Sequence, residues 1–323
     1  MAILFVPVVD TGLLLEGMFE NKTMARMLAA GIIDLDALSV TARAGDYVNI
    51  GRMPLPADFA RVDISSTVDL SPTAVSTKAE KAIVLRDASM NQYNVHDSIR
   101  TGGDVSAALS RGLGDKLAKR ICSQLFRGSI AGVQALTTSH TVDATAATAI
   151  TVNDVRKAKQ KLGDEGERMT TLVTTSLMWG DLLRDLSESY KITNVAGTVI
   201  LDGAINSLMG LTNIIVTDLV PDDQFAIGSA TVGCALLYAP QALYMAYQRA
   251  MQIEYQDNIL QPSTLKYVKA SMDWIGHPHG CTWGGSANPT DLAWGTSGSW
   301  TQQATDHREV GIAMIVANEG VYA

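Results

Sequence analysis

The sequence predicts an α+β fold, with helices early in the chain and strands late. Three observations support this class. Residues 45–97 contain short alternations of apolar and polar residues, which are typical of strands with one covered face. Residues 104–130 carry apolar residues at a helical spacing, and most of the segments between residues 213 and 317 read as strands.

The composition fits a large folded chain of 323 residues. Charged residues make up 18% of it, below the usual ~25%, which argues against disorder and favours extra buried interface. The net charge of −8 argues against a dedicated nucleic-acid-binding protein but permits local basic patches. Cys122, Cys234 and Cys281 lie far apart, so no disulfide framework is expected and a reducing compartment suits them. The apolar N-terminus lacks a preceding basic region, so no signal peptide is predicted.

The first 44 residues are predicted to form an arm with a short helix near Asn21–Ala30. A long extended arm follows at 45–97. An isolated two-stranded hairpin is at best marginally stable in water, so this arm must lie on something else. Because the chain has no obvious active site, another copy of the same chain is the favoured support. The residues expected to be buried between copies are Phe59, Val62, Ile64, Val68 and Leu70.

A long helix is predicted from an N-cap at Asp104 to about residue 130. Apolar residues recur in it at four-residue steps: Val105, Leu109, Leu113, Leu117, Ile121 and Leu125. Each step drifts by about 40° around the axis, so the stripe turns by about 200° over the helix. No single neighbour covers such a stripe, and we therefore expect a spine that different elements contact along its length.

The later elements follow from periodicity and from turn residues. Helices are predicted at 153–162, from Ser176 onward and at 204–209, and the strands before the uncharged segment are 169–174 and 213–217. The uncharged segment 224–248 is long enough to span a bilayer. Its glycine, serine, threonine and proline residues instead favour two buried strands joined near Pro240. The remaining predicted strands are 234–238, 243–248, 264–274 and 310–317.

The best metal candidate is His277-Pro-His279-Gly-Cys281, whose three ligands at two-residue steps could share one side of an extended segment. A fourth ligand is not evident, although Asp273 is near. We favour a turn after a strand, with histidine and cysteine partly exposed. No cofactor and no metal site are therefore predicted.

Four tryptophans fall late in the chain: Trp274, Trp283, Trp294 and Trp300. An aromatic platform of this kind could bind sugar rings or stack on bases. Tryptophans more often fill a core or an interface because they bury a large area, and we favour this interpretation.

The other motifs are incomplete or bland. Residues 228–233 have the outer spacing of a phosphate-binding loop without its Gly-Lys-Ser/Thr ending. The pairs Asp34/Asp36 and Asp222/Asp223 are interpreted as solvated loop charges. The basic residues of the long helix could meet a polyanion, or form a solvated or subunit-facing surface. They are Arg111, Lys116, Lys119, Arg120 and Arg127. No catalytic residue is predicted.

The order of these parts resembles the major capsid proteins of tailed double-stranded DNA bacteriophages, with the Hong Kong 97-type fold. Residues 155–174 resemble the helix and strand of the family's peripheral domain, and residues 203–218 resemble the start of its axial domain. Residues 277–300 resemble the end of one capsid subgroup. The resemblance implies an N-terminal arm at 1–44, an extended loop at 45–90 and an axial domain at 196–275. The peripheral domain would take residues 91–195 and 276–323, with the spine helix at about 104–130.

The resemblance implies a structural shell protein of the virion that is not an enzyme. Many copies would form hexamers and pentamers of an icosahedral shell around double-stranded DNA, after residence in the host cytoplasm. Expected partners are other copies of the chain, a separate scaffolding protein, a portal, packaged DNA held without sequence specificity and, where present, a decoration protein. No membrane is expected. Lys78 and Lys81 lie in the loop that some members cross-link, but no partner asparagine is identified and no cross-link is predicted.

Three alternatives stay open at this point. An encapsulin-like cellular compartment would use the same fold around a protein cargo. A carbohydrate-binding β-rich module would use the late tryptophans. A metal-dependent enzyme would be centred on His277.

Overall fold

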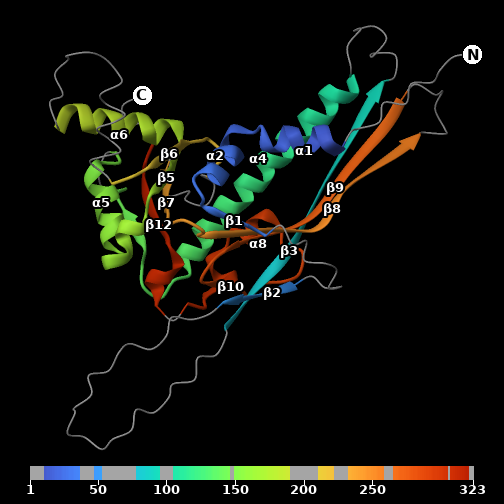
Figure 1. Cartoon of the computed structure of the whole chain (residues 1–323). Coiled ribbons are helices and arrows are strands. Elements are labelled where there is room, and N and C mark those ends of the chain that lie inside the picture. The colour runs from blue at the N-terminus through green and yellow to red at the C-terminus, as the bar shows by residue number, and fades with distance from the viewer. Residues whose placement is uncertain are drawn as a thin grey trace, which may run out of the picture.

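The computed structural model describes residues 11–36, 47–52, 78–94, 105–145, 149–189, 210–221, 232–257, 265–304 and 306–319. These residues form two five-stranded sheets and a two-stranded ribbon, together with the long helix α4 (Val105–Gln134) (Figure 1). The α+β class predicted from the sequence is confirmed. The larger of two main apolar clusters is built from α4 and both sheets, so the helix joins them through a common core.

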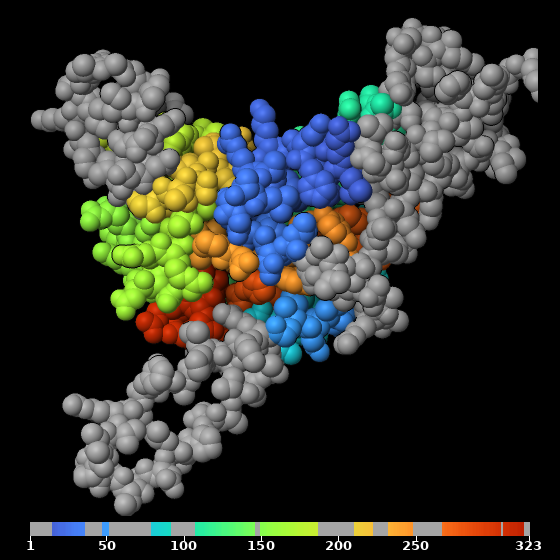
Figure 2. All heavy atoms as spheres, viewed as in Figure 1, coloured from blue at the N-terminus to red at the C-terminus, as the bar shows by residue number. Residues whose placement is uncertain are grey.

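The other helices lie on either side of this core. The α-helices are α1 (Thr11–Phe19), α2 (Lys22–Ala29), α5 (Val152–Gln160), α6 (Ser176–Ser189) and α8 (Asp291–Trp294). The 3-10 helices are η1 (Gly163–Arg168), η2 (Ser297–Ser299) and η3 (His307–Val310). Figure 2 shows the N-terminal helices, in blue, over the centre of one face of the molecule.

The first sheet has the strand order β1-β8-β9-β3-β2. Its strands are β1 (Ile33–Asp36), β2 (Tyr47–Arg52), β3 (Lys78–Asn94), β8 (Leu243–Asp257) and β9 (Leu265–Pro278). Strand β1 is parallel to β8, and the other neighbours are antiparallel. Three early strands thus share a sheet with two late ones, so strands are not confined to the late part of the chain. Asp34 and Asp36 belong to β1, and the prediction that they are loop charges is wrong.

Strand β3 changes partners along its length. Residues 78–83 pair with β2, and residues 84–94 pair with β9. The predicted hairpin therefore has a described base, formed by β2 and the start of β3. Phe59, Val62, Ile64, Val68 and Leu70 lie outside the described residues.

The second sheet has the order β4-β12-β7-β5-β6. Its strands are β4 (Thr141–Asp143), β5 (Thr171–Thr174), β6 (Asn213–Val216), β7 (Val232–Tyr238) and β12 (Ile312–Asn318). Leu236 and Met314 face the cluster around α4, whereas Leu237 and Ile315 face a second cluster with α5 and α6. Because both faces are covered, β7 and β12 are apolar almost throughout.

Burial of β7 on both faces of this sheet accounts for the lack of charge in that part of the segment 224–248. Strands β7 and β8 are joined by a turn at Pro240 and Gln241, as predicted, although β8 continues to Asp257. Gln241 has a positive φ of 57°, and its backbone N–H donates to the carbonyl of Gly31 at 2.7 Å. Among the described helices, none is long and apolar enough to cross a membrane.

Several predicted boundaries need adjustment. Asn21 caps α2 as its sequence suggests, since its side chain accepts from the backbone of Thr23 and Met24. Helix α1 was not predicted. Helix α5 begins one residue earlier than expected because Thr151 and Asp154 form a capping box. Helix α4 extends to Gln134, four residues beyond the predicted end.

Some predictions fall on residues outside the described part of the chain. They are the N-cap at Asp104, the helix at 204–209, the pair Asp222/Asp223 and residues 228–231 of the loop at 228–233, whose last two residues belong to β7.

Candidate functional site

The spine helix α4 is the element around which the candidate site is built. Its predicted stripe is more buried toward its C-terminal end: Leu109 and Leu117 are partly buried, Leu113 is buried, and Ile121 and Leu125 are almost completely buried. The stripe therefore contributes more apolar contact to the subunit core in its second half than in its first.

The neighbours of α4 change along its length. A Cβ added at Gly17 would lie 2.7 Å from the carbonyl oxygen of Arg111, so the backbones of α1 and α4 touch there. Further along, a Cβ at Gly128 would lie 3.0 Å from the ring of Trp294 in α8. Gly132 faces Pro278 at the end of β9. Different elements thus contact successive turns of the helix, as a drifting stripe requires.

Arg120 of α4 forms ion pairs with two other elements and connects to a third through a shared carboxylate. Its two terminal nitrogens donate to both carboxylate oxygens of Asp291 in α8, at 2.5 and 2.6 Å. Its Nε donates to Asp87 of β3 at 3.1 Å, and Trp274 of β9 donates to the second oxygen of Asp87 at 2.7 Å. The hydrogen bond from Arg120 holds the pKa of the Asp291 carboxyl below its usual 3.8. Arg120 stands out in the sequence as part of a basic set, whereas neither acid does, because they lie 33 and 171 positions away.

Removing one acid tests how much this network contributes to folding. Asp291→Ala is expected to lower the free energy of unfolding by about 1 kcal/mol, because the pair is bidentate but its side chains are 40% and 48% exposed. Chemical denaturation of the purified subunit measures the change. Asp164→Ala on the exposed surface of η1 is the control and should be close to neutral. Equal midpoints for the two variants would contradict a structural role for the network.

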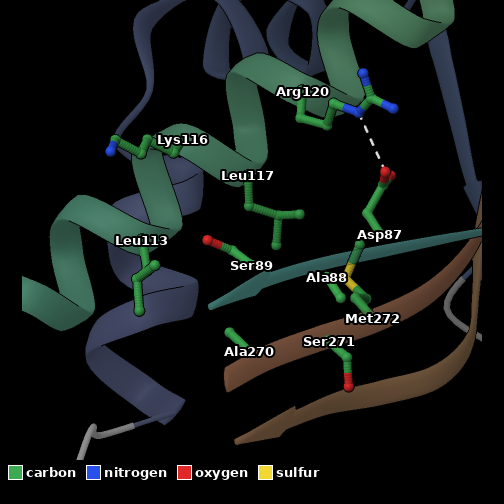
Figure 3. Close-up of a pocket in the computed structure, with 10 residues that line it drawn as sticks. All are labelled: Asp87, Ala88, Ser89, Leu113, Lys116, Leu117, Arg120, Ala270, Ser271 and Met272. Carbon is green, nitrogen blue, oxygen red and sulfur yellow. Dashed lines mark hydrogen bonds and ion pairs between the residues drawn. The ribbon is translucent and has the colours of Figure 1, made fainter. Parts of the chain in front are cut away.

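A cavity of about 240 Å³ lies between α4 and strands β3 and β9 (Figure 3). Leu113, Leu117 and Met272 form much of its apolar lining, and Lys116 and the Arg120–Asp87 pair provide its charged groups. Ser89 and Ser271 add hydroxyl groups to the lining, and Asp87 is held by Arg120 and Trp274. The cavity therefore offers a partly apolar surface with a few polar and charged groups at its wall.

The segment His277–Cys281 is buried more deeply than predicted. His277 and Cys281 are fully buried, so the expectation that they would be partly exposed is wrong, although a turn does follow the strand. The Nε2 of His277 lies 2.8 Å from the carbonyl oxygen of Cys281 and 3.5 Å from Glu80. Within the described residues, no group of three or more histidine, cysteine or acidic side chains is placed to hold a metal.

Glu80 of β3 is the residue of this region that sequence analysis missed. Its carboxylate is fully buried and accepts from the backbone N–H of Gly280 at 2.9 Å. Burial alone raises the pKa of this carboxyl, but hydrogen bonds from His277 and His279 outweigh it and hold the pKa well below 4.5. A signal existed in the sequence, because Glu80 shares a strand face with the apolar Ala82 and Val84.

The late tryptophans form part of the core. Trp283, Trp294 and Trp300 pack together with ring centroids 4.8–5.2 Å apart, and Trp274 is fully buried nearby in the same cluster. The favoured structural interpretation is confirmed. An exposed platform for sugar rings is not formed by these four side chains.

Several basic residues of α4 are paired within the subunit. Arg111 lies 3.7 Å from Glu16 of α1, Lys119 lies 2.6 Å from Asp115, and Arg120 is held as described above. Lys116 borders the cavity. This arrangement favours contacts within the subunit over a continuous surface for a polyanion.

His140 and His307 form a second polar pair, beside the second sheet. Nδ1 of the buried His140 lies 3.0 Å from the carbonyl oxygen of Ile312, so this nitrogen carries the proton. Its Nε2 then accepts from Nδ1 of His307 at 2.7 Å. Burial lowers the pKa of His140 below its ordinary 6.5, against the opposing effect of the bond to Ile312.

This pair predicts a loss of stability in mild acid. As pH falls below about 6.5, His140 is protonated in the unfolded chain but stays neutral in the folded chain, because its pKa is lower there. Protonation therefore favours the unfolded chain, and the free energy of unfolding decreases. One such group contributes a slope of up to about 1.4 kcal/mol per pH unit. His140→Gln should flatten the dependence measured by denaturant unfolding between pH 7 and 5, relative to the wild type. An unchanged slope would contradict this assignment.

Solved structures with the same fold are bacteriophage capsids. The capsid protein of the cyanophage P-SCSP1u superposes with a TM-score of 0.56 at 11% identity, covering 88% of this chain and 86% of that one. A chain of the Microbacterium phage Oxtober96 structure gives 0.58 at 12% identity, covering 90% of each chain. The Ralstonia phage GP4 capsid gives 0.54 at 12% identity, again covering 90% of each. At these identities the likeness establishes the fold.

The fold is therefore that of phage capsid proteins. The profile of the major capsid protein 13-like family matches residues 29–311, and the chain belongs to this family. No curated protein sequence gives a significant match. The predicted capsid identity, the structural role and the location in the virion are confirmed at this level.

Proposed function

We propose that many copies of this chain form the hexamers and pentamers of an icosahedral shell that encloses double-stranded DNA. Family membership supports a structural role in the capsid. The observation that supports our assembly scheme is the hairpin base, in which Tyr47–Arg52 pairs with Lys78–Ile83 and residues 53–77 continue from its end. We propose that this segment lies across an adjacent copy.

Burial between copies supplies the stabilisation in this scheme. The apolar positions Val62, Ile64, Val68 and Leu70 alternate with polar ones. Covering them would contribute about 25 cal/mol per Å² of apolar surface, a contribution absent in the monomer. Each copy would contact one neighbour and receive a contact from another, which is the heterologous geometry that closes rings.

We propose no catalytic role and no cofactor. The further partners in this scheme are a separate scaffolding protein, a portal, packaged DNA bound without sequence specificity and, where present, a decoration protein. Binding of DNA by the inner face would be weak, since the net charge of −8 opposes tight retention of a polyanion.

We also propose that the domains follow the two sheets. The boundary predicted near residue 195 separates β5 from β6, although these strands are parallel neighbours in the second sheet. The peripheral domain would contain the first sheet with α4, and the axial domain would contain the second sheet with α5 and α6.

Expression of the chain with and without its neighbouring genes tests the proposal, with particles scored by electron microscopy. Closed shells that contain DNA after infection would support the capsid role. Shells that enclose a protein cargo and no DNA would favour a compartment of the encapsulin type. A protein that stays monomeric in every combination would overturn the proposal.

A further inference from the structure

The hairpin base, formed by β2 and residues 78–83 of β3, is paired with another strand on only one side of β3. Residues 84–94 of β3 pair with β9, but the pairing ends at Val84, opposite Ile275. Residues 78–83 have β2 on one side, and β2 is the edge strand of the sheet. On the other side they face β10 (Cys281–Trp283) and the turn that precedes it, without a strand ladder between β3 and β10. The orientation of this base therefore depends on local contacts with that turn.

These contacts centre on Glu80. One carboxylate oxygen accepts the N–H of Gly280 at 2.9 Å, and the other lies 3.4 Å from Nδ1 of His279 and 3.5 Å from Nε2 of His277. The next residue, Lys81, donates its backbone N–H to the hydroxyl of Thr282 at 2.9 Å. Three polar groups from the strand end and the turn thus converge on one carboxylate.

The hairpin base is also held from β2. The hydroxyl of Tyr47 donates to the carbonyl of Gly285 at 3.3 Å, and the ammonium of Lys81 lies 3.7 Å from the ring centroid of Tyr47. These contacts are more exposed than Glu80, whose side chain has no accessible surface. The buried carboxylate of Glu80 therefore contributes most to fixing the orientation of the hairpin base.

A buried charge makes this attachment strongly dependent on geometry. If the hairpin base rotated away from the turn, Glu80 would lose its hydrogen bonds while still largely enclosed, and the buried His277 would lose its acidic neighbour. Partial rotation is therefore costly, so the base should occupy one defined orientation. An apolar contact in the same place would tolerate sliding, because apolar contacts have no directional requirement.

We propose that Glu80 is a positioning residue that fixes the angle between the hairpin base and the subunit body, and through it the direction in which residues 53–77 leave the subunit. This inference rests on the proposed role of those residues in contacts between copies. Its consequence is that a subunit with a loosened base folds normally but presents the segment to its neighbours at variable angles.

Glu80→Gln is the most direct test. Nε2 of His277 carries a proton, because it lies 2.8 Å from a carbonyl oxygen, so an amide NH₂ in place of the second carboxylate oxygen would face another donor. Hydrogen exchange of the purified subunit should become about tenfold faster in β2 and in residues 78–83. Exchange in β7 and β12 should stay unchanged. Glu165→Gln on η1 is the matched control and should alter neither region.

His279→Ala is the second variant, because this side chain is 20% exposed and its loss leaves the fold less disturbed than a change at Glu80. It should also speed exchange in β2, with fewer closed shells and more irregular particles in electron micrographs. Unchanged exchange in β2 and residues 78–83 in both variants would overturn the inference. Hydrogen exchange is measured on the unassembled subunit, so it tests the role of Glu80 even if the wild type forms no shells. Failure of the wild type to form shells would count against the proposed function and not against the role of Glu80.

Discussion

A subunit in which residues 54–76 are replaced by a short Gly-Ser linker is expected to fold and to form no closed shells. The deletion leaves β2 and all of β3 intact, including the contacts of Glu80 with Gly280 and of Lys81 with Thr282. Thermal unfolding should therefore stay near that of the wild type, while particle yield in electron micrographs falls to background.

Two milder variants test whether assembly depends on the apolar side chains of the segment or only on the segment being present. Serine at Val62, Ile64, Val68 and Leu70 should prevent assembly, because it removes the apolar side chains proposed to be buried on the neighbour. Alanine at the intervening Asp63, Ser65, Thr67 and Asp69 should leave assembly largely intact. Normal shells from the serine variant would show that this face does not carry the contact between copies.

Trp294→Ala is expected to cause the largest loss of subunit stability, about 3–5 kcal/mol, as for other buried tryptophans cut back to alanine. Its ring is 1% exposed and packs against Trp283 and Trp300. It also contacts Gly128 of α4, and its indole N–H donates to the carbonyl of Gln124 at 2.9 Å. The substitution leaves a cavity between α4 and α8 and removes the additional hydrogen bond that the carbonyl of Gln124 accepts from the indole. Denaturant unfolding of the purified subunit measures the loss.

Leu292→Ala provides the control within the same short helix. Leu292 is 76% exposed, so its truncation should change stability by less than about 0.5 kcal/mol. If Trp294→Ala proved as mild as this control, the tryptophan cluster would not be the packing centre that its burial indicates.

Periodicity and composition were enough to predict the elements that carry a local sequence signature. The four-residue steps from Leu109 to Leu125 predicted α4, and the uncharged stretch around Pro240 predicted two successive strands. A strand covered on both faces, such as β7, lacks polar positions altogether, and composition alone therefore reveals its burial. The family resemblance rested on this order of elements more than on any single motif.

Other features depend on contacts between distant parts of the chain. Arg120 meets Asp87 and Asp291 only because α4 crosses β3 beside α8, and no local pattern marks these two acids. Strand β1 is short and carries two aspartates, so it resembles a loop until its pairing with β8 is known. Glu80 looked like one charge among several in a polar stretch, although its strand parity placed it with Ala82 and Val84.

The most direct test of the assembly scheme is a cryo-electron microscopy reconstruction of particles formed by the wild-type chain, at a resolution that traces residues 53–77. The scheme predicts that this segment lies on an adjacent copy in every hexamer and pentamer, with Val62, Ile64, Val68 and Leu70 against that copy. A segment folded back onto its own subunit, with no contact to a neighbour, would contradict it.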